Sequence, residues 1–355
     1  MMTLRQFALR PRDIPTATVW YLTDLAEARG KQELYTRQSP QRLKVLREHA
    51  LIESAVSSNR IEGVEVAQDR IRTLVFGKPL LRDRAEEEVR GYRDASKLIH
   101  EKGGELPLHV DTVLRLHRLV RGEIGDAGRL RDKGCEIIET LPGGGRRVRF
   151  RALEAGEVPG AMRELFEAGQ NCIEDRWVHP LAALAALNLD FLCIHPFRDG
   201  NGRVSRLLLL LQCYHLGYEV GRYISLERLI EENKDRYYET LELSSQRWHQ
   251  GKHDPWPYVN YLLFILKSAY REFEDRLGQI KAPRGAKTEL VIAAIEKAGG
   301  PFRVGDLQQA CPGVSIDLIR RVLKQLRSAG RVKCLRLGAN AEWEKTRSRG
   351  ELGNT

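Results

Sequence analysis

The sequence predicts a mainly α protein, in which an all-helical core with one small β-hairpin precedes a small C-terminal domain. Long amphipathic patterns dominate, and Leu184, Leu187, Phe191 and Ile194, for example, share one helical face. Alternating runs typical of strands are few. A stretch with proline, glycine and charge at residues 281–286 separates the two parts. At 355 residues, the chain is long enough for two or three domains with ample cores.

The composition indicates a protein of a reducing compartment. No stretch reaches the roughly 18 apolar residues of a membrane span, and residues 1–11 lack the apolar core of a secretory signal. The six cysteines are scattered without a CxxC pair, and several lie in apolar periodic segments. We therefore expect a reduced, cytoplasmic protein that does not cross a membrane.

The N-terminal part, residues 1–70, is predicted to be helical and to end in a capped helix. Apolar residues recur at helical spacing from Ile52 to Ile61. Glu62 then lies near the helix end, where Gly63 forms the C-terminal cap.

The central part, residues 71–275, combines a hairpin with an apolar helix and a glycine-rich loop. Residues 135–149 are predicted to form the β-hairpin, which turns at the Pro-Gly-Gly-Gly run of residues 142–145. Residues 181–194 form the apolar helix, and it leads directly into the loop.

The loop and the helix start after it form the most informative stretch of the chain, His-Pro-Phe-Arg-Asp-Gly-Asn-Gly-Arg-Val-Ser-Arg at residues 195–206. Gly200 and Gly202 flank Asn201, so backbone N–H groups can face a ligand without obstruction by a Cβ atom. Because no helix breaker follows, a helix begins here. Its unpaired N–H groups and its dipole favour anionic oxygens.

The side chains of this stretch supply the other parts of a triphosphate site. Arg203 and Arg206 are three residues apart on one helical face, and each can bind phosphate oxygens with two donors. Asp199 is a hard oxygen ligand suited to Mg²⁺ that is shared with substrate phosphates. His195 has an unperturbed pKa near neutrality and is the natural general base. With no activated Ser or Cys nearby, it is expected to deprotonate an incoming hydroxyl.

The stretch resembles the signature of the Fic family, HPFx[DE]GNGRxxR, at every defining position. The likeness covers roughly residues 50–270 and includes the predicted hairpin, which occupies the place of the family's target-positioning flap. The resemblance implies protein adenylylation: AMP moves from ATP to a Ser, Thr or Tyr hydroxyl of a target protein or of the enzyme itself, and pyrophosphate leaves. Some relatives move phosphocholine or UMP instead, so ATP as the donor rests on the resemblance.

The resemblance also implies a role for each residue of the motif. His195 deprotonates the target hydroxyl, Asp199 holds Mg²⁺, and Arg206 binds the γ-phosphate of ATP. The residues that cradle the α- and β-phosphates are Gly200, Asn201, Gly202 and Arg203. We expect Tyr238 and Ser245 to contact the nucleotide base, although Tyr238 is as readily explained by packing. Ser245 falls where the family often has an Asn.

A second short motif, Ser-Asn-Arg-Ile-Glu-Gly at residues 58–63, fits the [ST]xxxE[GN] pattern of the family's inhibitory helix. In inhibited relatives this Glu pairs with the second arginine of the signature. The corresponding pair here is Glu62 and Arg206, and a carboxylate on that guanidinium both occupies its donors and repels a phosphate. We therefore expect an autoinhibited enzyme. Removal of AMP at the same site, with Glu62 orienting a water, is an alternative.

Residues 287–346 resemble a winged helix-turn-helix domain, after a linker at 276–286 and before a tail at 347–355. The predicted elements are three helices and two strands, at residues 288–298, 304–310, 315–329, 331–337 and 341–343.

The last fifth of the chain carries most of the positive charge. Residues 281–355 contain 15 Lys and Arg against 7 Asp and Glu, a net of +8, whereas the whole chain has +10. Basic residues of the third helix and of the wing are expected to meet phosphates of DNA. They are Arg320, Arg321, Lys324, Arg327, Arg331, Lys333 and Arg336. Docking to a protein is the alternative use of such a domain.

Two functions compete on the sequence alone. One is an autoinhibited adenylyltransferase with an accessory domain that binds DNA or a partner. The other is a DNA-binding transcriptional regulator that uses the Fic fold as a nucleotide sensor. The retained His195 favours the enzyme, because a sensor needs no base. The target protein is not specified, and a homodimer rests only on family analogy.

Overall fold

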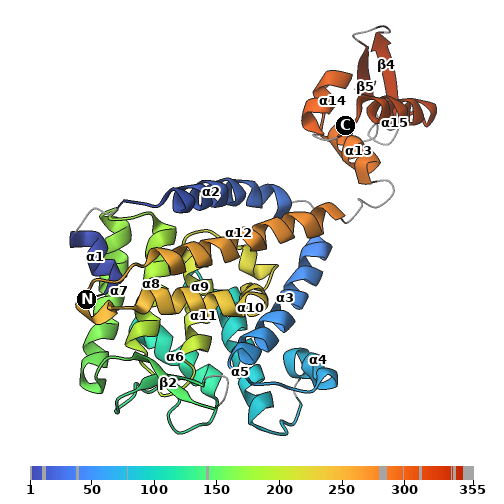
Figure 1. The fold of residues 1–355 in the computed structure, drawn as a ribbon. Helices are drawn as coiled ribbons and strands as arrows, with labels where there is room; N and C mark the ends of the chain where they lie inside the picture. Colours follow the sequence, from blue (N-terminus) through green and yellow to red (C-terminus); the bar gives the residue numbers. More distant parts are fainter. Residues whose placement is uncertain are drawn as a thin grey trace, which may run out of the picture. The chain divides into compact units, whose positions relative to one another are not determined.

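The computed structural model describes residues 2–9, 13–36, 40–77, 79–140, 144–279, 286–298, 300–311, 314–336, 338 and 341–346. The chain divides into two compact units, Met1–Leu277 and Gly278–Thr355. It is mainly helical and has two small sheets among the described residues (Figure 1). The described helices include none that is both long and apolar enough to span a membrane.

The first unit is a body of helices with one β-hairpin. Its N-terminal half contains α1 (Thr3–Leu9), α2 (Thr16–Thr36), α3 (Pro40–Ile61), α4 (Gln68–Phe76), α5 (Arg84–Lys102) and α6 (Val110–Arg121). The hairpin strands are β1 (Glu136–Thr140) and β2 (Arg146–Arg151). The later helices are α7 (Val158–Glu174), α8 (Pro180–Ile194), α9 (Asn201–His215), α10 (Leu226–Glu232), α11 (Lys234–Ser245) and α12 (Trp256–Gln279). Three short 3₁₀ turns are η1 (Ala155–Glu157), η2 (Val220–Arg222) and η3 (Trp248–Gln250).

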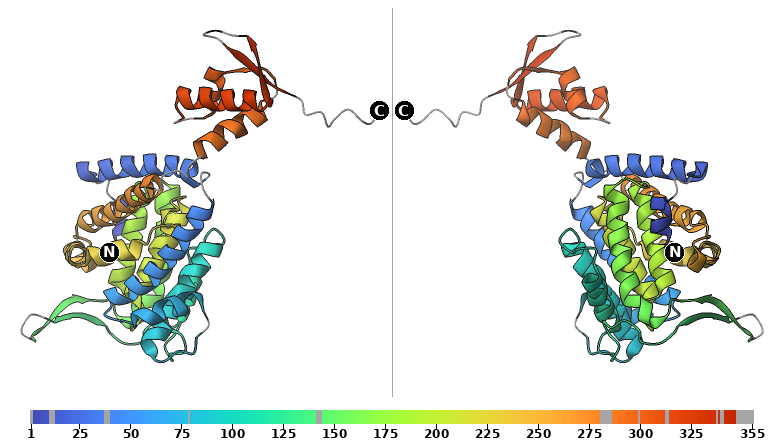
Figure 2. Two further views of the ribbon diagram at one scale, coloured as in Figure 1. Left: turned by 90° about the vertical axis from the view of Figure 1, so that its right-hand side faces the viewer. Right: turned by 90° about the vertical axis from the view of Figure 1, so that its left-hand side faces the viewer.

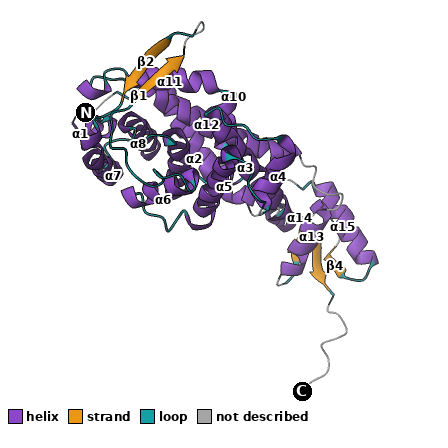
Figure 3. Ribbon diagram, turned by 90° about the horizontal axis from the view of Figure 1, so that it is seen from below, coloured by secondary structure: helices purple, strands orange, loops and turns teal. Residues whose placement is uncertain are grey.

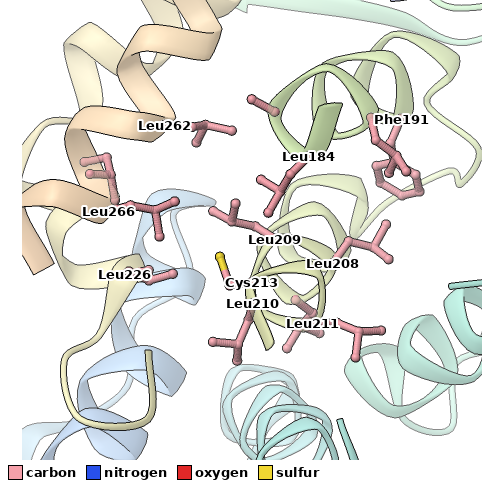
Figure 4. Close-up of a cluster of buried hydrophobic side chains, with 14 of the residues drawn as sticks. Leu184, Phe191, Leu208, Leu209, Leu210, Leu211, Cys213, Leu226, Leu262 and Leu266 are labelled. Atoms are coloured by element: carbon pink, nitrogen blue, oxygen red, sulfur yellow. The ribbon is translucent and has the colours of Figure 1, made fainter. Parts of the chain in front are cut away.

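Helices α8 and α9 lie at the centre of this unit, where almost all of their side chains are buried. Every residue of α8 from Leu181 to Ile194 is buried, and so is the leucine run 207–211 of α9. Side chains from α10 and α12 complete this core (Figure 4). The loop that joins α8 to α9 is therefore held between two closely packed helices.

A buried carboxylate fastens the N-terminal end of the chain to α8. Asp190 accepts hydrogen bonds from the backbone N–H groups of Thr3 and Leu4, at 2.8 and 3.1 Å, and from Trp248 Nε1 at 2.7 Å. It therefore caps α1 and joins η3 to α8. Burial raises the pKa of Asp190 although these donors oppose the shift. Asp190 lies five residues before His195, so this network steadies the helix that carries the predicted base.

The hairpin extends from the helical body beside α11 (Figures 2 and 3). Its strands pair antiparallel, with a bulge between Ile137 and Ile138. Arg147 and Arg149 of β2 form ion pairs with Glu242 of α11, at 2.9 and 3.1 Å. The predicted turn at 142–145 lies partly outside the described residues, because only 144 and 145 are described.

The second unit contains α13 (Ala286–Lys297), β3 (Phe302–Arg303), α14 (Val304–Ala310), α15 (Ile316–Ser328), β4 (Val332–Arg336) and β5 (Glu342–Lys345). The three helices and the two later strands lie where the sequence patterns placed them. The sequence does not predict strand β3, because two residues are too few to show an apolar–polar alternation. It pairs with β5, which gives an antiparallel sheet of order β3-β5-β4. Residues 280–285 of the predicted linker and the tail 347–355 lie outside the described residues.

Candidate functional site

The predicted base, His195, sits at the C-terminal cap of α8 in a left-handed conformation (φ 49°, ψ 64°). Its backbone N–H donates to the Phe191 carbonyl at 3.0 Å, and its Nδ1 lies 3.2 Å from the Leu192 carbonyl oxygen. A carbonyl only accepts, so Nδ1 carries the proton. The lone pair of Nε2 is then free to accept a proton. The local geometry selects the tautomer that a general base requires.

Arg131, which follows α6 in the chain, stabilises this strained turn. Its Nε donates to the His195 carbonyl at 2.8 Å and its Nη2 to the Ile194 carbonyl at 3.3 Å. Its backbone N–H donates to the Pro196 carbonyl at 2.9 Å. A non-glycine residue in the left-handed region costs about 1–2 kcal/mol, and these bonds offset that cost. Burial lowers the pKa of the Arg131 guanidinium from its ordinary value.

Gly200 and Asn201 build the start of α9. Gly200 adopts φ 85°, which favours glycine, and the first intrahelical bond runs from the Val204 N–H to the Gly200 carbonyl. The N–H groups of residues 201–203 precede that bond, whereas the Gly200 N–H already donates to Asp199 Oδ1 at 2.6 Å. The Asn201 amide is committed to the loop: its Nδ2 donates to the Phe197 carbonyl at 2.8 Å, and its Oδ1 accepts the Phe197 N–H at 2.9 Å. The side-chain amide of Asn201 is therefore paired within the loop, and its backbone N–H is the group left for a ligand.

His117 of α6 contacts the same loop through a hydrogen bond and a ring stack. Its Nδ1 accepts the Gly128 N–H at 2.9 Å, so its Nε2 donates to the Asp199 carbonyl at 3.0 Å. The ring stacks on Phe197, with centroids 3.7 Å apart. Burial lowers the pKa of His117 to about 4, which keeps it neutral. Nothing in the sequence singled out this histidine.

Two carboxylates share three arginines beside the loop. Arg203 bridges them, with Nη1 at 2.9 Å from Glu88 and Nη2 at 3.1 Å from Asp199. Arg121 lies 2.5 Å from Asp199 and 3.5 Å from Glu88. Arg84 lies 3.2 Å from Asp199 and 2.9 Å from Glu88. Glu88 is 3% exposed, whereas the Asp199 side chain is 47% exposed. Burial acts to raise the pKa of Asp199, but the arginines outweigh it and the pKa is lowered.

Arg206, the second arginine of the motif, is bound from α3. Its Nη2 donates to Glu62 Oε1 and to the Ser58 carbonyl, both at 2.8 Å, and its Nε donates to Ser58 Oγ at 2.8 Å. Burial acts to lower the pKa of Arg206, but Glu62 together with Tyr237 and Tyr92 outweighs it and the pKa is raised. A Cβ atom built on Gly202 would clash with Glu62 Oε1. The carboxylate therefore lies against both the guanidinium and the first turn of α9.

A glycine after α3 ends the helix, and a buried carboxylate of α10 holds the helix in place. The helix ends at Ile61, and Gly63 follows with φ 80°. Further back on α3, Ser54 donates to Glu227 Oε2 at 2.7 Å, while Tyr92 donates to Glu227 Oε1 at 2.8 Å. Glu227 is 2% exposed and belongs to α10. This network ties α3 to α5 and α10, and it holds Glu62 in position.

A cavity of about 600 Å³ is lined by some of these residues, but not by Asp199, Arg203 or Arg206. His195 and Gly202 line it together with Glu62, residues of both hairpin strands, and the two residues predicted to contact the nucleotide base, Tyr238 and Ser245. Burial raises the pKa of Tyr238, and its hydroxyl donates to the Ile61 carbonyl at 3.5 Å. The structure thus brings His195, Gly202 at the start of α9, Tyr238 and Ser245 to one cavity.

Burial lowers the pKa of His195 to about 4, below the unperturbed value near neutrality. The free imidazole is consequently neutral throughout the physiological range. The part of the chain that the structure describes contains no group of three or more His, Cys, Asp or Glu placed to hold a metal ion.

Comparisons with known proteins find relatives of the part of the chain that contains this site. Residues 107–213 match the family model for the Fic/DOC family. The chain contains a Fic domain. It is 24% identical over 223 residues to the protein adenylyltransferase Fic of Drosophila yakuba, and 27% identical over 222 residues to that of Drosophila persimilis. These matches cover 55% and 59% of the chain, which spans about 40% of the length of either relative.

Solved structures show the same fold. A Fic family protein from Desulfovibrio desulfuricans matches with a TM-score of 0.61 at 23% identity, over 95% of this chain and 98% of its own. A Fic domain containing signaling protein from Bacteroides thetaiotaomicron matches with a TM-score of 0.59 at 20% identity, over 73% and 98%. At these identities the likeness concerns the fold alone.

Proposed function

We propose that this protein is an autoinhibited adenylyltransferase that transfers AMP from ATP to a Ser, Thr or Tyr hydroxyl of a target protein. The observation that carries the proposal is the position of His195. Its Nδ1 lies 3.2 Å from the Leu192 carbonyl oxygen, which leaves Nε2 to accept a proton, and His195 lines the same cavity as Gly202 at the start of α9. A base and an anion site adjoin there, as a nucleotidyl transfer requires.

The reaction follows from these positions. Nε2 of His195 takes the proton of the target hydroxyl as its oxygen bonds to the α-phosphorus of ATP. The bond from that phosphorus to the bridging oxygen breaks, and pyrophosphate leaves with the bonding electron pair. The N–H groups at the start of α9 stabilise charge on the phosphates. Because His195 is neutral at rest, no deprotonation precedes this step.

The residues beside the loop fit a divalent cation that arrives with the nucleotide. Asp199 offers a half-exposed carboxylate, and Mg²⁺ commonly takes one or two carboxylates plus substrate phosphates. When bound, Mg²⁺ would neutralise phosphate charge. Asp199 would have to exchange its contacts with Arg84 and Arg121 for the cation, while buried Glu88 keeps the arginines paired.

Arg206 is the proposed ligand of the γ-phosphate, and Glu62 is the group proposed to block that contact. Arg206 is buried, and its Nη1 has no hydrogen-bond partner among the described residues. That free donor supports an anionic ligand beyond Glu62. In the resting structure the Glu62 carboxylate occupies Nη2 and lies against Gly202, where it repels a phosphate. We therefore propose that displacement of Glu62 activates the enzyme.

Tyr238 and Ser245 are proposed to flank the adenine, since both belong to α11 and line the cavity. The hairpin is proposed to position the target segment through backbone hydrogen bonds, as sheet edges do for extended peptides. Such pairing reads little of the target's side chains, so the target remains open to experiment.

Label transfer tests the proposal. The purified Glu62→Gly variant, whose own labelling is followed, is incubated with Mg²⁺ and ATP labelled at either the α- or the γ-phosphate. Adenylylation predicts protein-bound label from α-labelled ATP only, and its loss in the Glu62→Gly, His195→Ala double variant. Label from γ-labelled ATP would identify a kinase, and nucleotide binding without transfer would favour the sensor. Release of AMP from pre-labelled protein by the wild type would identify the reverse activity.

A further inference from the structure

We propose that Glu88 is a positioning residue of the candidate site, and that its buried carboxylate lets Asp199 exchange arginines for a divalent cation. Glu88 acts through those arginines and touches neither the cation nor the nucleotide. The inference rests on the proposed function, since it concerns the cation that arrives with the nucleotide.

Glu88 lies on α5 and is buried, and both of its carboxylate oxygens face arginines. Oε2 lies 2.9 Å from Arg203 Nη1. Oε1 lies 2.9 Å from Arg84 Nε and 3.5 Å from Arg121 Nη1. A carboxylate retains its charge at such depth only when cations pair with it. Glu88 is therefore a fixed counter-charge for guanidinium groups of α5, α6 and α9.

Asp199, in the loop before α9, shares the same three arginines. Its Oδ2 lies 2.5 Å from Arg121 Nη1 and 3.2 Å from Arg84 Nη2, and its Oδ1 lies 3.1 Å from Arg203 Nη2. Unlike Glu88, Asp199 is half-exposed, so a cation from solution can reach it. Because a cation on Asp199 repels the arginines there, they need another carboxylate. Glu88 already binds all three.

The ion pairs close into a cluster whose formal charge is zero, since three arginines face three carboxylates. The members are Arg84, Arg121, Arg203, Glu88, Asp126 and Asp199. Without Glu88 the cluster has one positive charge in excess, and the arginines compete with a cation for Asp199. The loss of one neighbouring charge changes the proton affinity of a carboxylate by about tenfold or more. We expect a divalent cation to respond at least as strongly.

Glu86 is a matched control on the same helix. It is as deeply buried as Glu88, and its Oε1 lies 2.8 Å from Arg70 Nε of α4. Replacement of either glutamate by Gln breaks a buried ion pair, so both changes should lower the melting temperature. Among the described residues, Arg70 forms no ion pair with Asp199. A merely structural role for Glu88 therefore predicts the same behaviour of the two variants.

The test measures binding of ADP to the full chain by isothermal titration calorimetry, in EDTA and at increasing Mg²⁺. ADP lacks the γ-phosphate, so it does not need the Arg206 donor that Glu62 occupies. The two readouts are the metal-free affinity and the midpoint, which is the Mg²⁺ concentration that gives half of the full effect. Thermal unfolding verifies that each variant is folded at the temperature of the measurement.

Mg²⁺ should strengthen the binding of ADP to the wild type. Glu88→Gln should raise the midpoint by about tenfold, while its metal-free affinity for the ADP anion stays equal or rises. Arg84→Gln, at an exposed side chain, should lower the midpoint. The double variant Arg84→Gln, Glu88→Gln has a neutral cluster again, so its midpoint should return most of the way to the wild-type value. Glu86→Gln should match the wild type in both readouts.

An unchanged midpoint in Glu88→Gln, or a loss of ADP binding both with and without Mg²⁺, would overturn the proposal. If Glu88→Gln does not fold, an unchanged or higher midpoint in Arg84→Gln has the same consequence. The Asp199→Asn variant separates this inference from the proposed function. A Mg²⁺ response that persists in Asp199→Asn overturns the proposed cation site and the role of Glu88 together. A response that is lost in Asp199→Asn but unaltered in Glu88→Gln refutes the role of Glu88 alone.

Discussion

Replacement of Glu62 tests whether its carboxylate inhibits the resting protein. The change to Gly removes one charge-assisted hydrogen bond, from Arg206 Nη2 to Glu62 Oε1 at 2.8 Å. Such bonds contribute about 1.5–3 kcal/mol. The Glu62 side chain is 32% exposed, which favours the lower half of that range. Because every 1.4 kcal/mol is tenfold, ATP should gain about 10- to 50-fold in productive binding.

The assay measures the initial rate of self-labelling from α-labelled ATP at subsaturating concentration. Glu62→Gln retains an acceptor for Arg206 but not the charge, so it should fall between the wild type and Glu62→Gly. Glu65→Gln is a matched control, since Glu65 is exposed nearby and has no ion pair among the described residues. A rate in Glu62→Gly equal to or below that of the wild type would refute autoinhibition by this carboxylate.

Three further predictions concern the same site. Gly202→Ala should lower the unfolding free energy by about 1–2 kcal/mol in the wild type, because the new Cβ would displace the Glu62 carboxylate. The same change should cost little in the Glu62→Gly variant. Equal costs in urea titrations of the two proteins would contradict the position of Glu62. Glu88→Gln should cost about 3 kcal/mol in the same assay, since it leaves three arginines with less counter-charge, whereas Glu101→Gln on the exposed side of α5 should cost under about 0.5. Because burial lowers the pKa of His195 to about 4 from 6.5, the unfolded state binds its proton first as pH falls below 6.5. Stability is then lost by about 1.4 kcal/mol per pH unit down to the folded pKa, and His195→Asn should reduce this slope; an unchanged slope would argue against the low pKa.

Local signals explain what the sequence predicted well. The apolar helix before His195, the glycine at 200 and the unbroken helix after it are each written in neighbouring residues, so α8, the loop and α9 follow directly. The position of Glu62 near a helix end also has a local sign, in Gly63. Its contact with Arg206 joins distant parts of the chain, and only the family resemblance indicated it.

The supporting residues of the site could not be predicted from the sequence. Glu88 stands in a run of three glutamates on α5, a pattern typical of a solvated helix face, yet it is buried against Arg203. His117 is a lone histidine of an amphipathic helix, and its stacking on Phe197 depends on tertiary packing. Strand β3 has only two residues, which is too short for any periodicity.

The central claim is that His195 acts as the base of AMP transfer. Intact-mass measurement of Glu62→Gly after incubation with ATP and Mg²⁺ tests it most directly, beside the Glu62→Gly, His195→Ala double variant. Adducts with the mass of AMP should form on the first protein and be absent from the second, while both bind ATP. Equal adduct formation on the double variant would contradict the account.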